Sequence, residues 1–182
     1  MNQLSGNSMV ARLKAGDQEA FGQVYERFKG DVLALAAAML GQQDEAWDIL
    51  HEVFVSLARA APELAPESNL KAYLLTAAAN RARDHLSKRR ACSVGLDAAL
   101  EVAGPKSDDP VRVALRDEEA RRLWKGLASL PAEQRAVVAL HIYGDQTFKE
   151  IAKSEGVSEN TVQSRYRYGL QKIRRQWLRE SP

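Results

Sequence analysis

Apolar side chains recur every three or four residues along most of the chain, which predicts a largely helical protein. The clearest stripe lies between Asp17 and Gly41. Asp17 suits the N-cap of this helix, because its carboxylate can accept a hydrogen bond from a backbone N–H of the first turn. Gly41 suits the C-terminal end, where a left-handed backbone is favourable for glycine. The apolar stripe consists of Phe21, Val24, Tyr25, Phe28, Val32, Leu35, Ala36 and Met39.

Two more helices are predicted, over residues 44–60 and 70–89. The segment APELAPESN between them holds two prolines and is typical of a loop. Each helix has its own packing stripe. These stripes are Ile49, Leu50, Val53, Phe54 and Leu57 in the first helix, and Leu70, Tyr73, Leu74, Ala77, Ala78 and Leu86 in the second.

Residues 91–112 interrupt the helical pattern with Gly, Pro, Ser and Asp, which predicts a flexible interdomain linker. Helices resume over about 113–130. Pro131 suits the first turn of a further helix that ends near Gly144, because its missing N–H is not needed there. This helix carries Val137, Val138, Leu140 and Ile142. The expected fold class is all-α, with two small helical domains joined by the linker.

The segment TFKEIAKSEGVSENTVQSRYRYGLQKIRR has the pattern of a helix-turn-helix. Thr147 and Glu150 form a capping box at the start of the first helix. Gly156 suits the turn and Ser158 the cap of the second helix. Glu155 stands where such motifs usually carry an apolar residue. The stripe expected to be buried is Val162, Tyr166, Leu170 and Ile173, with Val157 beneath the turn.

The outer face of the second helix carries side chains that can read base edges in the major groove, whereas other cations suit phosphates. An ordinary helical hairpin with a solvated basic face is the alternative. The candidate base-facing residues are Asn160, Gln163, Ser164, Arg167 and Tyr168, and the candidate phosphate contacts are Arg165, Lys172, Arg174 and Arg175.

Composition is that of a globular protein: 182 residues, 45% hydrophobic and 27% charged. No apolar run approaches the roughly 20 residues of a membrane span, and the N-terminus lacks the apolar core of a signal peptide. The single Cys92 cannot form an internal disulfide, which favours the reducing cytoplasm.

The net charge of +2 conceals an uneven distribution. Residues 81–90 hold five basic side chains and one acidic, and residues 161–180 hold six basic and one acidic. The rest of the chain is therefore acidic, with a net charge of −7. Two basic segments at the ends of separate helices favour nucleic acid as a partner, although each segment alone is also compatible with a solvated helix face.

The ordered set of segments resembles bacterial RNA polymerase sigma factors. LKAGDQEAFGQVYERF, DEAWDILHEVFVSLARA and LKAYLLTAAANRARDHLSKRR are similar to their promoter-recognising domain, and SLPAEQRAVVALHIYGDQTFKEIAKSEGVSENTVQSRYRYGLQKIR to their second domain. The short length resembles the extracytoplasmic-function (ECF) group of the sigma-70 family. The implied organisation is a region 2-like domain over 10–90, a linker over 91–112 and a region 4-like domain over 113–180.

The resemblance implies a transcription initiation factor with three binding surfaces. The helix over 44–60 would dock on the β′ coiled coil of core RNA polymerase through Asp44, Asp48, His51, Glu52 and Val55. The helix over 70–89 would bind the minus-ten element through Asn80, Arg81, Arg83, Lys88 and Arg89. The helix-turn-helix would bind the minus-thirty-five element as duplex through Asn160, Gln163, Ser164, Arg165, Arg167, Tyr168 and Lys172. The polymerase β flap and an anti-sigma factor are further implied partners.

Other functions fit the residues less well. The pattern Asp48-x-x-His51 could ligate iron in a helical bundle, but a second such set is missing from the sequence. No catalytic or nucleotide-binding motif is found, so we expect neither an enzyme nor a bound cofactor or metal. Tyr73, where relatives often carry Trp, suits packing or base stacking, and Cys92 beside basic residues could act as a thiol sensor. A helix-turn-helix regulator with a sensing or dimerising N-terminal domain, or a protein-binding adaptor, are the alternatives.

Overall fold

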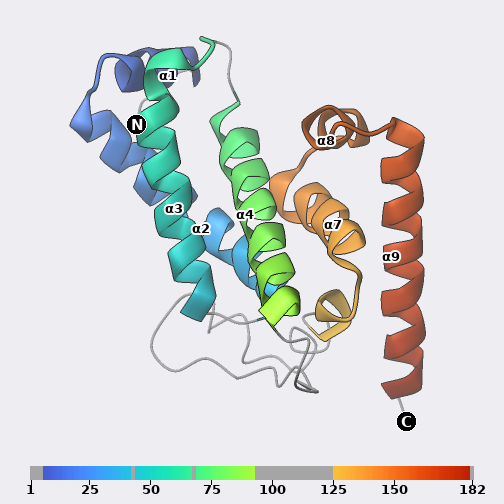
Figure 1. Cartoon of the computed structure of the whole chain (residues 1–182). Helices are drawn as coiled ribbons and strands as arrows, with labels where there is room; N and C mark the ends of the chain where they lie inside the picture. Colours follow the sequence, from blue (N-terminus) through green and yellow to red (C-terminus); the bar gives the residue numbers. More distant parts are fainter. Residues whose placement is uncertain (1–5, 42–43, 67–68, 93–124, 181–182) are drawn as a thin grey trace.

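The computed structural model describes residues 6–41, 44–66, 69–92 and 125–180, and all of the regular structure in these ranges is helical (Figure 1). The prediction of an all-α protein is therefore confirmed. The helices are, in chain order, α1 (Gly6–Lys14), α2 (Gln18–Leu40), α3 (Asp44–Ala60), the short 3-10 helix η1 (Ala61–Glu63), α4 (Leu70–Cys92), α7 (Ala132–Gly144), α8 (Phe148–Glu155) and α9 (Glu159–Glu180).

Helix α2 begins and ends where the sequence predicts. The Asp17 carboxylate accepts a hydrogen bond of 3.1 Å from the backbone N–H of Ala20. Gly41 closes the helix in the left-handed conformation with φ of 71° and donates its N–H to the Ala37 carbonyl. A side chain at position 41 would be strained by this backbone, so the end of α2 is fixed by the glycine.

Helices α2, α3 and α4 pack around one apolar core, and α3 and α4 lie beside each other in Figure 1. The ring of Phe54 on α3 meets Tyr25 of α2 edge-on, with ring centroids 4.8 Å apart. Leu74 and Leu75 of α4 are fully buried. Tyr73 is partly buried against this core, which agrees with a packing role.

The helix-turn-helix is formed by α8 and α9. Thr147 and Glu150 make both hydrogen bonds of the capping box. Gly156 ends α8 with φ of 67°, and the Ser158 hydroxyl accepts from the N–H of Thr161 at the start of α9. The local signals that predicted two helices and their turn are thus confirmed.

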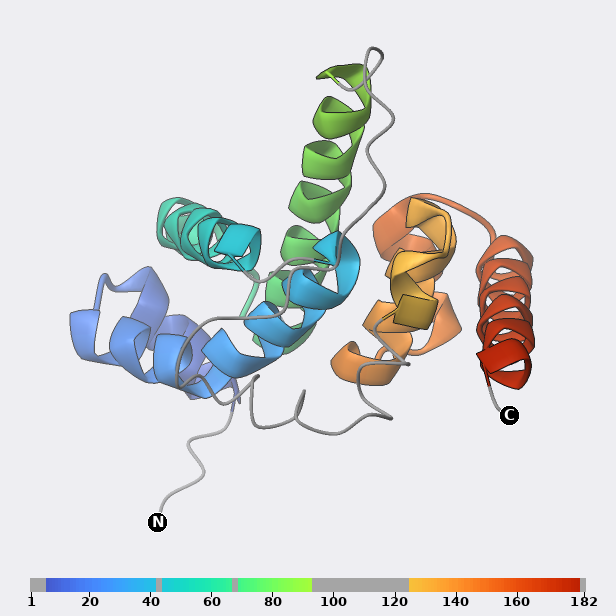
Figure 2. The same cartoon turned by 90° about the horizontal axis from the view of Figure 1, so that it is seen from below.

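Helix α7 joins the two halves of the molecule. It packs on α2 and α4 on one side and on α9 on the other, as the view from below shows (Figure 2). Its residues Val137 and Leu140 belong to the same core as α2 and α4. The N-terminal half (α1 to α4) and the C-terminal half (α7 to α9) are therefore packed against each other through a continuous apolar interface, in addition to being joined by the chain.

Two buried polar side chains cross this interface. Arg135 of α7 is only 5% exposed and donates to the Met39 carbonyl in the last turn of α2. It also donates to the carbonyls of Ala128 and Leu130. Gln146, 3% exposed, lies 3.4 Å from the carbonyl of Ala72 on α4. A buried cation near a helix C-terminus is favourable because the carbonyls there lack helical partners.

Several details differ from the sequence prediction. The expected loop after α3 begins with the single turn η1, α4 continues to Cys92, and Pro131 caps α7 from just outside the helix. Leu170, which was expected to be buried, is 38% exposed, and Ile142 is 48% exposed. Most of the predicted linker, the side chain of Cys92 and the part of the helix predicted over about 113–130 that precedes residue 125 lie outside the described residues. Residues 125–128 of that predicted helix are helical.

Candidate nucleic-acid and polymerase interface

The candidate base-reading face of α9 is open to solvent. Asn160, Gln163, Arg167 and Tyr168 are exposed, and Ser164 is partly exposed. Arg167 lies over the ring of Tyr168, 5.2 Å from its centroid. This stacking restrains both side chains, while the remaining guanidinium N–H groups can still point outward. The structure thus places the amide groups of Asn160 and Gln163 and the guanidinium of Arg167 on the face expected to meet the major groove.

Two of the predicted phosphate contacts on α9 are bonded within the chain. The Nζ of Lys172 donates to the Ser129 carbonyl at 2.7 Å. The Nη1 of Arg165 lies 3.4 Å from Oε2 of Glu133 on α7. These contacts join α9 to α7 and to the turn that precedes α7. Arg174 and Arg175 are exposed.

The candidate minus-ten residues line α4, and most of them also have partners. Asn80 and Lys88 are exposed. Arg81 pairs with Glu52 of α3 at 3.4 Å and donates to the Ser56 hydroxyl. Arg89 pairs with Glu45 at 3.2 Å. Carboxylates of α3 therefore hold two of the α4 cations against the helix beside them.

Arg83 of α4 is turned toward the helix-turn-helix. Its guanidinium makes two contacts of 2.5 Å with the carboxylate of Glu155, at the end of α8. It also donates to Glu133 at 3.1 Å and to the Asn80 side chain. The sequence singled out Glu155 as unusual without giving a reason, and the structure supplies one. Glu155 stands where an apolar residue is usual, and its buried carboxylate is paired there with an arginine.

The candidate polymerase face of α3 is exposed and acidic. Asp48, His51 and Glu52 are exposed and Val55 is partly exposed, whereas the side chain of Asp44 lies outside the described part of the chain. The sequence interpretation missed Trp47, which is 46% exposed. Trp47 stands one turn before His51 on the same side of α3, so its place outside the apolar stripe was the available signal.

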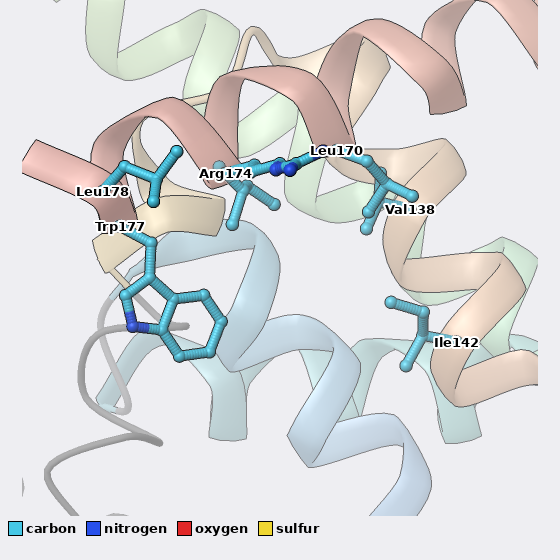
Figure 3. A pocket seen from close by; sticks show the side chains of 7 residues that line it. Val138, Ile142, Leu170, Arg174, Trp177 and Leu178 are labelled. Atoms are coloured by element: carbon cyan, nitrogen blue, oxygen red, sulfur yellow. The ribbon is translucent and has the colours of Figure 1, made fainter.

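An apolar groove runs between α7 and α9, and it also went unpredicted. Figure 3 shows Trp177 and Leu178 of α9 on one side of it and Ile142 of α7 on the other. Leu178 is 68% and Trp177 40% exposed. Arg174 adds a positive charge at its edge. Contiguous exposed apolar side chains of this kind mark a site of protein contact.

No helix in the described ranges has the length and apolar character needed to cross a membrane. Among those same residues, no group of three or more His, Cys, Asp and Glu side chains is placed to hold a metal ion.

Comparison with known families gives two matches in chain order. Residues 24–92 match the family Sigma-70 region 2, and residues 120–173 match Sigma-70, region 4. Together they cover more than half of the chain. The first match contains α3 and α4, and the second contains α7, α8 and most of α9.

Individual proteins agree with this result. The chain is 28% identical over 172 residues to the ECF RNA polymerase sigma factor SigK of Mycobacterium tuberculosis, covering 92% of this chain and 91% of SigK. It is 26% identical over 192 aligned residues to the RNA polymerase sigma-H factor of Pseudomonas aeruginosa, covering 100% of both.

Two solved structures share the fold. CnrH, in complex with the cytosolic domain of CnrY, has a TM-score of 0.71 at 22% identity and covers 96% of this chain and 98% of CnrH. The sigma factor RpoE, in complex with the anti-sigma factor NepR from Bartonella quintana, also has a TM-score of 0.71, at 19% identity, over 88% of this chain and 98% of RpoE. Both family regions are present in chain order, and SigK and the sigma-H factor match this chain over nearly all of its length. The chain therefore belongs to the ECF group of sigma-70 RNA polymerase sigma factors.

Proposed function

We propose that the chain is a dissociable subunit of RNA polymerase that directs promoter-specific transcription initiation and has no catalysis of its own. The observation that carries the proposal is the open face of α9, where Gln163 and Arg167 are exposed behind a well-formed turn at Gly156. Amide and guanidinium groups on such a face can form paired hydrogen bonds with base edges.

The helix-turn-helix would bind the minus-thirty-five element as duplex DNA. Asn160, Gln163, Ser164, Arg167 and Tyr168 would face the bases. Arg165 and Lys172 would sit near phosphates after exchanging their contacts within the chain for the DNA backbone. Base contacts would supply the sequence preference and phosphate contacts the register.

Helix α4 and the loop before it would bind the minus-ten element. Asn80 would contact bases, and Arg81, Arg83, Lys88 and Arg89 would neutralise phosphates of the opened strand. A basic surface beside pockets for unstacked bases is the general requirement for binding a single strand. In the proposed domain assignment, the domain over 10–90 binds the minus-ten element and the domain over 113–180 binds the minus-thirty-five element, which lies upstream and is called the upstream element below. The linker over 91–112 joins the two domains.

Two surfaces would bind core polymerase. The acidic face of α3, with Asp44, Asp48, His51, Glu52 and Val55, would dock on the β′ coiled coil. Its exposed acids complement a basic partner, and Trp47 beside them adds the large apolar area typical of an interface centre. The groove between α7 and α9 would bind the β flap, because Trp177 and Leu178 provide an exposed apolar surface there.

An anti-sigma factor is a further proposed partner. The solved structures of similar fold are complexes with the cytosolic domain of CnrY and with the anti-sigma factor NepR. Both the polymerase and the promoter DNA place the proposed activity in the bacterial cytoplasm.

The proposal is tested by assembling the chain with core RNA polymerase and recovering genomic fragments from the complex. We expect a stable complex whose recovered fragments share two short motifs at a fixed spacing, because the two DNA surfaces belong to one chain. Fragments enriched equally by core alone, or by the free chain without core, would contradict it; the second result would favour a helix-turn-helix regulator instead.

A further inference from the structure

Glu159 is an acidic side chain at the start of the basic helix α9. It is exposed, as are Gln163 and Arg167 further along the helix. Its carboxylate contacts an amide of the same helix: Nε2 of Gln163 lies 3.4 Å from Oε1 of Glu159. Because the side chain is exposed, the carboxylate can also accept a hydrogen bond from a partner outside the chain.

An acid in the first turn of a helix also has a structural explanation, because the free backbone N–H groups there attract negative charge. In α9, however, this end already has a cap. The Ser158 hydroxyl accepts from the N–H of Thr161 at 3.1 Å. On a face that meets DNA, moreover, a carboxylate is repelled by the phosphates. Stabilisation of the helix end therefore does not by itself explain an acid at this place.

Glu159, Gln163 and Arg167 lie along one side of α9, because each is four residues from the next. Their hydrogen-bonding groups differ in a regular order. The carboxylate accepts, the amide both accepts and donates, and the guanidinium donates. The N-terminal part of the second helix is the part of a helix-turn-helix that contacts base edges. This side of α9 is therefore an ordered series of groups for reading bases, and Glu159 stands at its N-terminal end.

Glu159 also fixes how the neighbouring amide is turned. An ionised carboxylate cannot donate a hydrogen bond, so the atom of Gln163 that faces it must be the amide nitrogen. The amide oxygen and the second amide N–H of Gln163 then remain for DNA. Adenine presents the complementary pair in the major groove, since its N6 amino group donates and its N7 accepts. The contact with Glu159 thus prepares Gln163 to read adenine.

The base that suits the carboxylate itself follows from the groups that each base presents in the major groove. Guanine presents two acceptors, and thymine presents an acceptor and a methyl group. Adenine has a donor, but the N7 acceptor beside it repels a carboxylate. Cytosine presents its N4 amino group with no acceptor beside it on the same base. An acid on this face therefore selects cytosine over the other three bases.

We propose that Glu159 is a specificity-determining residue of the helix-turn-helix: its carboxylate accepts a hydrogen bond from N4 of a cytosine in the upstream element, and it orients Gln163 toward a nearby adenine. Four residues of helix rise about 6 Å, and successive base pairs are stacked about 3.4 Å apart. The cytosine and the adenine should therefore be one or two base pairs apart. The proposal rests on the proposed function, because it requires α9 to lie in the major groove of promoter DNA.

The test is selection by the holoenzyme, assembled from core polymerase and the full chain, among recovered genomic fragments whose upstream motif has been randomised. Glu159→Gln keeps the size of the side chain, removes its charge and lets it donate as well as accept. Glu63→Gln makes the same change at an exposed site of η1 and is the matched control.

We expect the unmodified chain and Glu63→Gln to select a C·G pair one or two positions from an A·T pair. Glu159→Gln should reduce the preference for cytosine by about 5-fold or more, which is the usual effect of one wrong base pair. Its binding to duplexes without that cytosine should be equal or tighter, because a charge repelled by phosphates has been removed.

A second measurement removes the amino group from the DNA instead of the carboxylate from the protein. The selected cytosine is replaced with 2-pyrimidinone, which lacks the N4 amino group. This replacement should lower the affinity of the unmodified holoenzyme more than that of the Glu159→Ala holoenzyme. The weaker base pairing of the analogue is the same for both proteins, so it does not contribute to the difference.

An unchanged preference for cytosine in Glu159→Gln, or an upstream motif without cytosine, would overturn the proposal. Uniform weakening of all duplexes by Glu159→Gln would also overturn it and would leave Glu159 a role in the stability of α9 alone. In each of these results the unmodified chain still selects an upstream motif. A failure of the proposed function is therefore distinct, because it would show as no complex with core or no shared motif at all.

Discussion

On α9, neighbouring side chains are prepared for different tasks. Arg167 and Gln163 are exposed and face outward, whereas Lys172 and Arg165 already have partners on Ser129 and Glu133. Gln163 contacts Glu159 of its own helix at 3.4 Å and Arg167 stacks on Tyr168 of its own helix, so these contacts do not tie either side chain to another element. A side chain that is exposed to a base edge can contribute to sequence preference, and one that must leave a partner on another element contributes less to affinity. Individual residues of the same helix should therefore respond differently to substitution.

Arg167→Ala should reduce discrimination within the upstream element. A paired contact between guanidinium and a base is worth roughly 1–3 kcal/mol against the wrong base. The measurement is competition between duplexes that differ at single positions, using the assembled holoenzyme. Arg175→Ala serves as the control, because Arg175 is an exposed candidate phosphate contact on the same helix. It should weaken binding to all duplexes alike. Uniform weakening by Arg167→Ala as well would reassign Arg167 to the DNA backbone.

Glu150 links the helix-turn-helix to pH. Hydrogen bonds from the N–H and hydroxyl of Thr147 lower the pKa of Glu150 below its ordinary value of 4.5. The charged form thus stabilises the fold above that value, and this stabilisation is lost as pH falls through the lower folded pKa. Glu150→Gln keeps a capping-box side chain without the charge. We expect it to be less stable at pH 7, by about 0.3–1 kcal/mol.

The measurement is denaturant unfolding of both proteins at pH 7 and at pH 3. The difference between them should shrink at the lower pH, because the unfolded chain then binds a proton at Glu150 and the stabilisation by the charged form is progressively lost. A difference that is the same at both pH values would show that the charge of Glu150 does not contribute.

At the scale of elements, local signals predicted most helix ends. Asp17, Gly41, Thr147 and Gly156 act through their own hydrogen bonds or backbone conformation, so their effect is readable from neighbouring sequence. Exposure of the helix faces was harder to predict. Leu170 continues the buried stripe of α9 by spacing, yet α7 diverges from it and leaves the groove open, because which face is covered depends on how helices pack.

The groove between α7 and α9 yields a prediction for this scale. Leu178→Asp should weaken binding to core polymerase by about 1 kcal/mol or more, since it places a charge in an apolar interface. Because Leu178 is mostly exposed, stability should change by less than about 0.5 kcal/mol. Gln171→Asp makes the same change of charge at an exposed site of α9 outside the groove. Equal affinity of the two variants for core would contradict a polymerase role for the groove.

At the scale of the whole molecule, the two halves are joined by contacts between residues far apart in the chain. Arg135 meets Met39, and Glu155 meets Arg83, across 96 and 72 positions. Periodicity and motif spacing carry no information about such pairs, so the sequence predicted two helical domains and a linker but not their shared interface. The odd glutamate before Gly156 was the one visible sign of it.

Arg135→Ala should destabilise the whole molecule and not α7 alone. It leaves the carbonyls of Met39 and Leu130 without their buried donor, and a buried acceptor without a partner costs roughly 1–3 kcal/mol. Calorimetry should show a lower midpoint for the entire transition, because α7 shares a core with α2 and α4. Arg59→Ala, at an exposed site, is the control. A separate early transition, with the rest unchanged, would show that the halves fold independently.

The central claim is that this chain gives RNA polymerase its promoter. Run-off transcription on the recovered genomic fragments tests it directly, with core polymerase supplied in every reaction. We predict defined transcripts only when the chain is added, and weaker, less selective initiation with Arg167→Ala. Transcripts of equal yield without the chain, or none when chain and core form a complex on these fragments, would contradict the claim.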